Sequence, residues 1–262
     1  MKEIAPANPL EMLAYVISLQ IENNKVVYIG TGLPMVGAAL AAKTHAPHIT
    51  QVFESGAQDP LHGDMPWSVC DPFTWRKSPM IQEMAYSFGQ VYNGYVDIAF
   101  LGGAQVDPYG NVNTTVIGDY HKPKARLTGS GGNNDLASLS DSLCLVGIQT
   151  ADKFPAKCDY VTSVGWLEGG DSRRKAGLIG NGPKAVITQL GVYDFHPESR
   201  RMRIKSLHPG ITFEIAQACT GFELLKPNGS EIPVTPTPPP EVLEILRTEV
   251  DPRGVFTKLP TA

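Results

Sequence analysis

The sequence predicts an α/β fold built on a mostly parallel sheet, and two observations lead to that class. Over residues 10–53, apolar residues at helical spacing alternate with short continuous apolar runs, in the order helix, strand, helix, strand. This β–α–β order favours parallel strands joined by right-handed crossovers. No internal repeat and no linker strong enough to split domains is present, so residues 1–262 are expected to form one domain.

The first half of the chain supplies the centre of this sheet. Leu10, Leu13 and Ile17 mark one face of an amphipathic helix, and Ala and Leu dominate the helix that follows the first strand. The expected helices cover residues 10–21, 35–43 and 80–95, and the expected strands cover residues 25–29, 49–53 and 96–101. Residues 57–80 are expected to be irregular, and a loop of that length usually covers a site or has a function.

The second half adds strands and two further helices. We expect strands over residues 143–148 and 160–164, a hairpin over residues 185–195, and helices over residues 209–220 and 241–249. The glycine-rich residues 129–132 should feed a helix that an Asn or Asp caps. The proline-rich residues 233–240 should form an extended spacer before the last helix.

Composition excludes several classes of function. The net charge is −4 without a basic run, which argues against binding to nucleic acid or to an anionic membrane surface. No apolar run is long enough to span a bilayer, and the N-terminus lacks the layout of a secretion signal, so we expect a cytoplasmic protein. The four cysteines are scattered and read as reduced thiols. Pro47 lies between His45 and His48, so no metal site is expected there.

Familiar phosphate-binding and nucleophile motifs are absent or incomplete. Gly30-Thr31-Gly32 resembles the start of a dinucleotide fingerprint, but Met35 stands where the third glycine is needed. No P-loop and no G-x-S-x-G elbow is present. Residues 172–175 match S-x-x-K without its partner motifs, so a solvated basic turn is the preferred interpretation.

Glu54 directly follows the buried strand over residues 49–53, which leaves a strand exit or a placed reactive group as its two interpretations. Ligands of open parallel sheets bind beyond the carboxyl ends of the strands, which favours the reactive group. Gly102-Gly103-Ala104-Gln105 follows another strand, and its backbone amides suit an oxyanion hole, although a plain glycine turn is equally possible. Together these features suggest a carboxylate that attacks an activated acyl group.

These residues and several other motifs resemble the B subunits of glutaconate CoA-transferase-like enzymes in the class I CoA-transferase family. The resemblance covers nearly the whole chain. It is carried by Gly30-Thr31-Gly32-Leu33-Pro34, Ala46-Pro47, Glu54-Ser55-Gly56, the run from Gly102 to Asn113, Ile117-Gly118-Asp119-Tyr120, Thr128-Gly129-Ser130-Gly131-Gly132 and Asp159-Tyr160-Val161-Thr162-Ser163.

The resemblance implies an open CoA-transferase/NagB-like α/β fold, with helices on both faces of the sheet and some antiparallel hairpins. It implies a homologous A subunit, an active site at the A–B interface and an A2B2 or larger assembly. Coenzyme A and acyl-CoA would be substrates, with no tightly bound cofactor. Glu54 would be the nucleophile that forms an acyl anhydride and then a glutamyl-CoA thioester. The expected oxyanion or substrate-binding residues are Gly102, Gly103, Ala104 and Gln105, and the expected cleft residues are Gly30, Gly32, Ser55, Gly56, Gly131 and Gly132.

Two alternatives stay open at this point. Similar two-subunit proteins that lack the glutamate are decarboxylases or carbon–carbon hydrolases acting on acyl-CoA, and Glu54 could serve as a general base in such a reaction. A non-catalytic subunit that binds acyl-CoA is the second alternative. Residues 57–80, with Trp67, Trp75 and Arg76, depart from the glutaconate enzymes, so the acyl group is left open.

Overall fold

The computed structural model describes residues 5–60, 65–229 and 231–259. The first four residues, on which the expected location partly depends, and residues 61–64 of the long loop lie outside the described residues. The chain forms two compact units: unit 1 holds Met1–Phe100 and Pro236–Ala262, and unit 2 holds Leu101–Thr235. The expected single domain stays a prediction. The expected spacer over residues 233–240 contains the point at which the chain passes from unit 2 back to unit 1.

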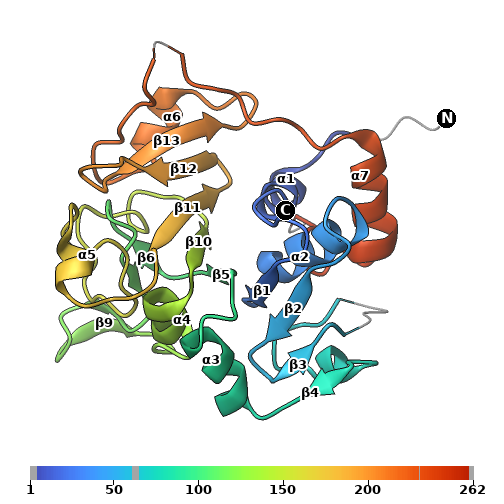
Figure 1. Cartoon of the computed structure of the whole chain (residues 1–262). Helices are drawn as coiled ribbons and strands as arrows, with labels where there is room; N and C mark the ends of the chain where they lie inside the picture. The colour runs from blue at the N-terminus through green and yellow to red at the C-terminus, as the bar shows by residue number, and fades with distance from the viewer. Residues whose placement is uncertain (1–4, 61–64, 230, 260–262) are drawn as a thin grey trace. The chain divides into compact units, whose positions relative to one another are not determined.

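Unit 1 is built on parallel strands with helices packed against them (Figure 1). Its elements are α1 (Pro9–Ser18), β1 (Val26–Ile29), α2 (Leu33–Lys43), β2 (Thr50–Phe53), β3 (Ala57–Gln58), the 3-10 helix η1 (Pro72–Trp75), β4 (Met80–Ile81), α3 (Met84–Tyr92), β5 (Ile98–Leu101), α7 (Pro240–Ile245) and the π-helix η2 (Leu246–Val250). Strand β1 pairs in parallel with β2 and with β5, whereas β3 runs antiparallel to β2 and β4 antiparallel to β3. The expected β–α–β order is therefore confirmed.

The N-terminal helix is fixed at its start by a capping box. Asn8 Oδ1 accepts hydrogen bonds from the amides of Leu10 (2.9 Å) and Glu11 (3.0 Å), and the Glu11 carboxylate accepts one from the Asn8 amide (2.8 Å). Arg247 of η2 donates to both carboxylate oxygens of Glu11, over 2.7 and 2.8 Å. This bidentate pair ties the C-terminal segment to the first helix of unit 1.

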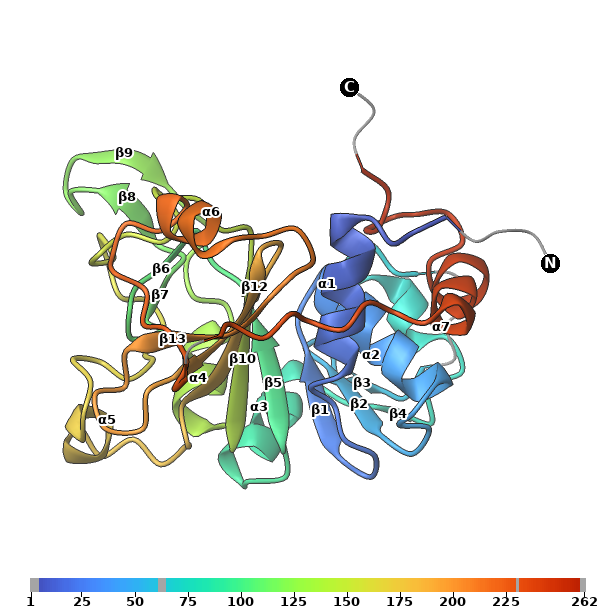
Figure 2. The ribbon, with the colours of Figure 1, turned by 90° about the horizontal axis from the view of Figure 1, so that it is seen from above.

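Unit 2 carries a mixed sheet and two short hairpins (Figure 2). Its elements are β6 (Gln105–Val106), β7 (Val112–Asn113), β8 (Val116–Gly118), β9 (Pro123–Arg126), α4 (Asn133–Leu139), β10 (Ser142–Gly147), α5 (Ser172–Lys175), β11 (Pro183–Thr188), β12 (Gly191–Phe195), β13 (Met202–Leu207) and α6 (Phe213–Ala218). Strand β10 is parallel to β11, and β11, β12 and β13 follow as antiparallel neighbours. Strands β6 and β7 form one hairpin, and β8 and β9 the other.

Each unit has its own apolar core. Short strands buried on both faces explain the continuous apolar runs seen in the sequence. Fully buried side chains of unit 1 include Leu13, Ile17, Tyr28, Leu40, Phe53 and Phe100, and those of unit 2 include Leu143, Leu145, Ile187, Tyr193 and Ile204. No helix within the described ranges is long and apolar enough to cross a membrane.

Several expected elements differ from the structure. The helix expected from residue 80 begins at Met84, because Met80–Ile81 pairs with β3 instead. Residues 57–80 are therefore not wholly irregular, since they contain β3, η1 and the start of β4. The strand expected over residues 160–164 is wrong: only Ser163 forms a bridge there, with Val112. Strand β13 was missed, although the alternation of its apolar residues with Arg203 and Lys205 is the pattern of a half-buried strand.

The start of α4 and the proline-rich segment also differ from expectation. Gly132, and not an Asn or Asp, is the N-cap of α4, and Asn133 already belongs to the helix. The proline-rich segment is extended, but it is more than a spacer. The Thr235 amide donates to Leu207 O over 2.8 Å, and the Thr235 side chain is buried. The side chain is buried because the segment forms a parallel bridge, from Val234 to Leu207, with the end of β13 in unit 2.

Candidate active site

Glu54 lies immediately beyond the carboxyl end of β2, as expected. The register pairs Ile29 with Phe53, so Gly30 and Glu54 follow the ends of two neighbouring parallel strands. The turn after Glu54 is closed by a hydrogen bond from the Gly56 amide to Phe53 O (2.9 Å). Gly56 has a φ of 88°, and a side chain there would collide with the carbonyl oxygen of Gln82. Glycine is thus required at position 56 by the backbone itself.

The Glu54 carboxylate is half-buried and forms no hydrogen bond or ion pair with any described residue. Burial raises the pKa of this carboxyl group above its ordinary value. The Cys70 thiol lies close enough for the Glu54 charge to add to burial in raising the pKa of the thiol. A carboxylate without internal donors keeps its electron pairs available for attack on an acyl group or for accepting a proton.

Val69 and Thr74, in the segment after β3, form hydrogen bonds with the turns that follow β1 and β2. The Val69 amide donates to Thr31 Oγ1 over 3.2 Å, beside the expected cleft residues Gly30 and Gly32. The Ser55 and Thr74 hydroxyls lie 3.2 Å apart, and the Thr74 side chain is fully buried. The long loop is therefore built onto the Glu54 turn within unit 1.

Gly30 and Gly32, in the turn after β1, are required by the local backbone structure. A Cβ on Gly30 would lie 2.6 Å from Phe100 O, which shows how closely the turn after β1 approaches β5. Gly32 has a φ of 94° and stands as the N-cap of α2. Turn geometry and close packing explain both residues, and a role for either in binding CoA stays a prediction.

The glycine loop after β5 belongs to unit 2, and two of its amide groups have no acceptor among the described residues of that unit. Gly102 and Gly103 are exposed, and their amides donate to no described residue of the same unit. The Ala104 amide, by contrast, donates a hydrogen bond to Asn113 O (2.9 Å). Gln105 is buried, and its side chain bonds to Asn113 and to Asp159. Gly102 and Gly103 therefore suit an oxyanion hole, while Ala104 and Gln105 hold the loop in place.

The second glycine-rich turn of unit 2 lies beside this loop. Asn133 Nδ2 donates weakly to Gly102 O over 3.4 Å, directly after Gly131 and Gly132. Gly131 is exposed with a φ of 50°, and Gly132 is buried. The structure therefore brings Gly131, Gly132 and the Gly102–Gln105 loop together within one unit.

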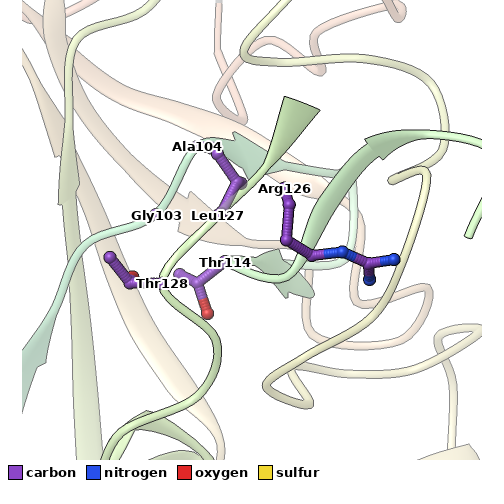
Figure 3. A pocket seen from close by; sticks show the side chains of 6 residues that line it. All are labelled: Gly103, Ala104, Thr114, Arg126, Leu127 and Thr128. Atoms are coloured by element: carbon purple, nitrogen blue, oxygen red, sulfur yellow. The ribbon is translucent and has the colours of Figure 1, made fainter. Parts of the chain in front are cut away.

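A pocket of about 570 Å³ opens next to the glycine loop (Figure 3). Its lining residues are Gly103, Ala104, Thr114, Arg126, Leu127 and Thr128. Thr114, Arg126 and Leu127 were not singled out from the sequence, because they lie in or next to β7, β8 and β9 at positions just outside the motifs that carry the family resemblance. Only the pairing of these strands brings the three residues to the glycine loop.

The solvated basic turn expected over residues 172–175 is only partly correct. Arg174 and Lys175 are exposed and pair with Asp171. Arg173, however, is buried and donates to carbonyl groups of three segments, and burial lowers its pKa to about 10. Its acceptors are the carbonyl oxygens of Ala137, Ser138, Val164, Gly165 and Gly180. The Ser172 hydroxyl donates to the carbonyl oxygens of Trp166 and Gly169 in the loop before α5, and not to a base that could activate it as a nucleophile.

Comparison with known proteins identifies the family. The sequence profile of the family described as coenzyme A transferase matches residues 10–216. The chain belongs to the coenzyme A transferase family. It is 39% identical over 257 residues to the B subunit of glutaconate CoA-transferase from Acidaminococcus fermentans, with 96% of this chain and 95% of that protein covered. It is 36% identical over 238 residues to the B subunit of 3-oxoadipate CoA-transferase from Pseudomonas knackmussii, with 90% and 91% covered.

The fold agrees with this assignment. The crystal structure of glutaconate coenzyme A-transferase from Acidaminococcus fermentans matches with a TM-score of 0.92 at 37% identity, over 98% of this chain and 100% of that chain. The cholesterol ring-cleaving hydrolase IpdB subunit of Rhodococcus jostii is more distant, at 28% identity over 233 residues, 85% of this chain and 83% of that protein. The expected CoA-transferase of B-subunit type with an α/β fold is confirmed.

Proposed function

We propose that Glu54 is the residue that carries coenzyme A, in a transferase that moves CoA from an acyl-CoA to a carboxylic acid. The observation that supports this most directly is the half-buried Glu54 carboxylate, which has no hydrogen-bonding or ionic partner among the described residues and whose pKa is raised by burial. A carboxylate held in this way is a better nucleophile than one stabilised by donors, because less stabilisation is lost when it attacks.

The proposed reaction proceeds in balanced steps. A Glu54 oxygen attacks the thioester carbonyl of the acyl-CoA, and CoA leaves as a thiolate, which gives a mixed anhydride. The thiolate then attacks the Glu54 carbonyl of this anhydride, releasing the acyl group as a carboxylate and forming a glutamyl-CoA thioester. The accepting carboxylate repeats both steps in reverse, which yields the new acyl-CoA and restores Glu54.

Each attack places negative charge on a carbonyl oxygen. The exposed Gly102 and Gly103 amides, which lack an acceptor among the described residues of unit 2, would donate to that oxygen. Loss of one such donor costs about 2.7–4 kcal/mol of transition-state stabilisation in comparable sites. Under this proposal Gly30, Gly32, Ser55, Gly56, Gly131 and Gly132 shape the cleft that receives the acyl-CoA.

The partner is an A-type subunit, as the names of the two B-type relatives suggest. We propose that it completes the active site at the A–B interface, in an A2B2 or larger assembly, with acyl-CoA and a free carboxylate as substrates. The expected location in the cytoplasm and the expected lack of a tightly bound cofactor remain predictions.

The similarity to a ring-cleaving hydrolase subunit supports a second candidate. In a decarboxylase or carbon–carbon hydrolase, Glu54 would act as a general base and would form no bond to CoA. The two candidates thus differ in whether Glu54 is modified covalently during turnover.

Borohydride trapping separates them. The complex with the A-type subunit is incubated with acyl-CoA and borohydride, which reduces a glutamyl-CoA thioester to a primary alcohol, and the Glu54 peptide is then weighed by mass spectrometry. Transfer predicts the alcohol at Glu54 only when acyl-CoA is present, and no exchange in Glu54→Gln. Consumption of acyl-CoA with an unmodified Glu54 would instead support the hydrolase or decarboxylase.

A further inference from the structure

The buried face of α3 carries a hydroxyl group at a position where an apolar side chain would pack more readily. Ser87 and Val91, four residues apart, form this buried face. Ser87 is fully buried, and it lies within unit 1 together with the Glu54 turn. A buried hydroxyl is costly unless it forms hydrogen bonds, so the contacts of Ser87 decide what this position contributes.

The hydrogen bonds of Ser87 reach the strand end from which Glu54 projects. The Ser87 hydroxyl donates to Phe53 O over 3.1 Å and lies 3.1 Å from the hydroxyl of Tyr28 in β1. A serine inside a helix commonly donates to a carbonyl of the preceding turn of the same helix, whereas Ser87 bonds across to β1 and β2. The next residue, Phe88, packs on the Tyr28 ring with centroids 5.5 Å apart, which holds α3 against β1.

The Phe53 carbonyl oxygen accepts from two segments. The Gly56 amide donates to it from the turn (2.9 Å), and Ser87 donates to it from α3. This carbonyl and the Glu54 amide belong to one planar peptide group. Two donors from different segments therefore fix the plane from which the Glu54 Cα extends. The Glu54 carboxylate itself has no partner among the described residues, so its position depends on this backbone plane.

We propose that Ser87 is a positioning residue for Glu54, which it holds in reacting geometry through the Phe53 carbonyl. The proposal rests on the proposed role of Glu54 and adds the residue that sets its position. Ser87 is fully buried, so it acts through the backbone and touches no substrate. Each attack on or by the Glu54 carboxyl group requires close alignment of the reacting atoms, and a misplacement of about 1 Å can lower a rate by about 10²-fold.

The ordinary interpretation of Ser87 is a small residue that lets α3 approach the sheet closely. Alanine is as small as serine and favours a helix more strongly, so close packing by itself would be served at least as well by alanine. The hydroxyl and its bond to Phe53 O are what alanine lacks. Ser87→Ala therefore separates a positioning role from a packing role.

Kinetics of the complex with the A-type subunit test the proposal. Ser87→Ala should lower kcat roughly tenfold, as expected for a displacement of less than 1 Å, and should leave KM for acyl-CoA unchanged. The rate at which the Glu54 thioester forms in a single turnover, followed by borohydride trapping and mass spectrometry, should fall by the same factor. The Kd of CoA, measured by titration calorimetry without turnover, should stay at its wild-type value.

Two further variants complete the design. Ser18 is also a buried serine of a helix in unit 1, and its hydroxyl donates to Tyr15 O over 2.7 Å, away from the Glu54 turn. Ser18→Ala thus removes a comparable buried hydrogen bond and should leave kcat unchanged. Urea midpoints of the two alanine variants show whether their stabilities are comparable. Ser87→Cys keeps the side-chain shape with a weaker donor, so its kcat should lie between those of Ser87→Ala and the wild type.

A wild-type kcat in Ser87→Ala would overturn the proposal, as would an equal loss of kcat in Ser18→Ala. The outcome is separable from that of the proposed function. Formation of the Glu54 thioester at the wild-type rate in Ser87→Ala would refute the role of Ser87 and keep the transfer. Turnover without any Glu54 thioester in the wild type, but roughly tenfold slower in Ser87→Ala, would refute the transfer and keep Ser87 as the residue that positions Glu54 as a base.

Discussion

Ser55 donates a hydrogen bond from Oγ to Thr74 Oγ1 over 3.2 Å, and the direction follows from the other contact of Thr74. Thr74 gives its single hydroxyl proton to Asp71 O over 2.7 Å, so its oxygen can only accept from Ser55. The Ser55 proton is therefore donated to Thr74 and not to Glu54. This leaves the carboxylate without a donor from its neighbour in the chain.

Thr74→Val should change the pH dependence of the reaction. The variant removes the acceptor for Ser55, whose proton then becomes available to Glu54 and lowers the pKa of that carboxyl group. We expect the acid limb of kcat/KM to move to lower pH, and kcat to fall several-fold because the carboxylate becomes less nucleophilic. A pH profile of the complex with its A-type subunit measures both.

Matched variants separate this effect from loss of packing. Thr74→Ser keeps the hydroxyl and should behave like the wild type. In the double variant Thr74→Val/Ser55→Ala the freed proton is gone, so the acid limb should return to its wild-type position. An acid limb that does not move in Thr74→Val would show that Ser55 has no influence on Glu54.

Glu54→Gln should increase stability at neutral pH. Burial raises the pKa of Glu54 in the folded protein, so between its ordinary value of 4.5 and the raised value the folded state binds more protons than the unfolded state. Wild-type stability therefore falls as pH rises through that interval, and glutamine avoids this loss. Urea unfolding at pH 7 should show a higher midpoint for the variant, with the difference disappearing below about pH 4. A lower midpoint at pH 7 would contradict a carboxylate that burial destabilises.

Gly56→Ala should disrupt the turn that holds Glu54. The φ of 88° is unfavourable for alanine, and the added carbon would collide with Gln82 O. We expect a destabilisation of about 2–4 kcal/mol, measured by urea unfolding, together with loss of CoA exchange. Gly89→Ala provides the control, since a Cβ there meets no atom within 4 Å and the residue lies inside α3. It should be neutral or slightly stabilising.

Arg173→Met should be strongly destabilising although no acidic partner is lost. The side chain donates to the carbonyl oxygens of Ala137, Ser138, Val164, Gly165 and Gly180, and methionine leaves these acceptors without their donor. We expect a loss of about 3 kcal/mol or more in the unfolding free energy. Arg174→Met, one residue along and exposed, should stay within about 0.5 kcal/mol of the wild type. Similar midpoints for the two variants would remove the structural role assigned to Arg173.

The sequence was sufficient where local pattern decides the structure. Period and length of the apolar runs predicted β1, α2, β2 and β5, because a buried strand or helix must present apolar residues at its own spacing. The same reasoning placed Glu54 beyond a strand end. It missed β13, although the apolar residues of that strand alternate with Arg203 and Lys205. It failed at residues 160–164, where the neighbouring segments decide which residues pair, whatever the intrinsic preference.

What the sequence by itself determined is the family, the parallel arrangement around β1 and the position of Glu54 at the end of β2. Only the tertiary structure showed that Thr74 takes the proton of Ser55, that Arg173 is buried, and that Arg126 and Thr114 meet the glycine loop in one pocket. The physical reason is that each of these relationships joins residues that are not neighbours in the chain. Hydrogen-bond direction, burial and the lining of a pocket depend on how strands pair and loops pack, which residue spacing does not encode.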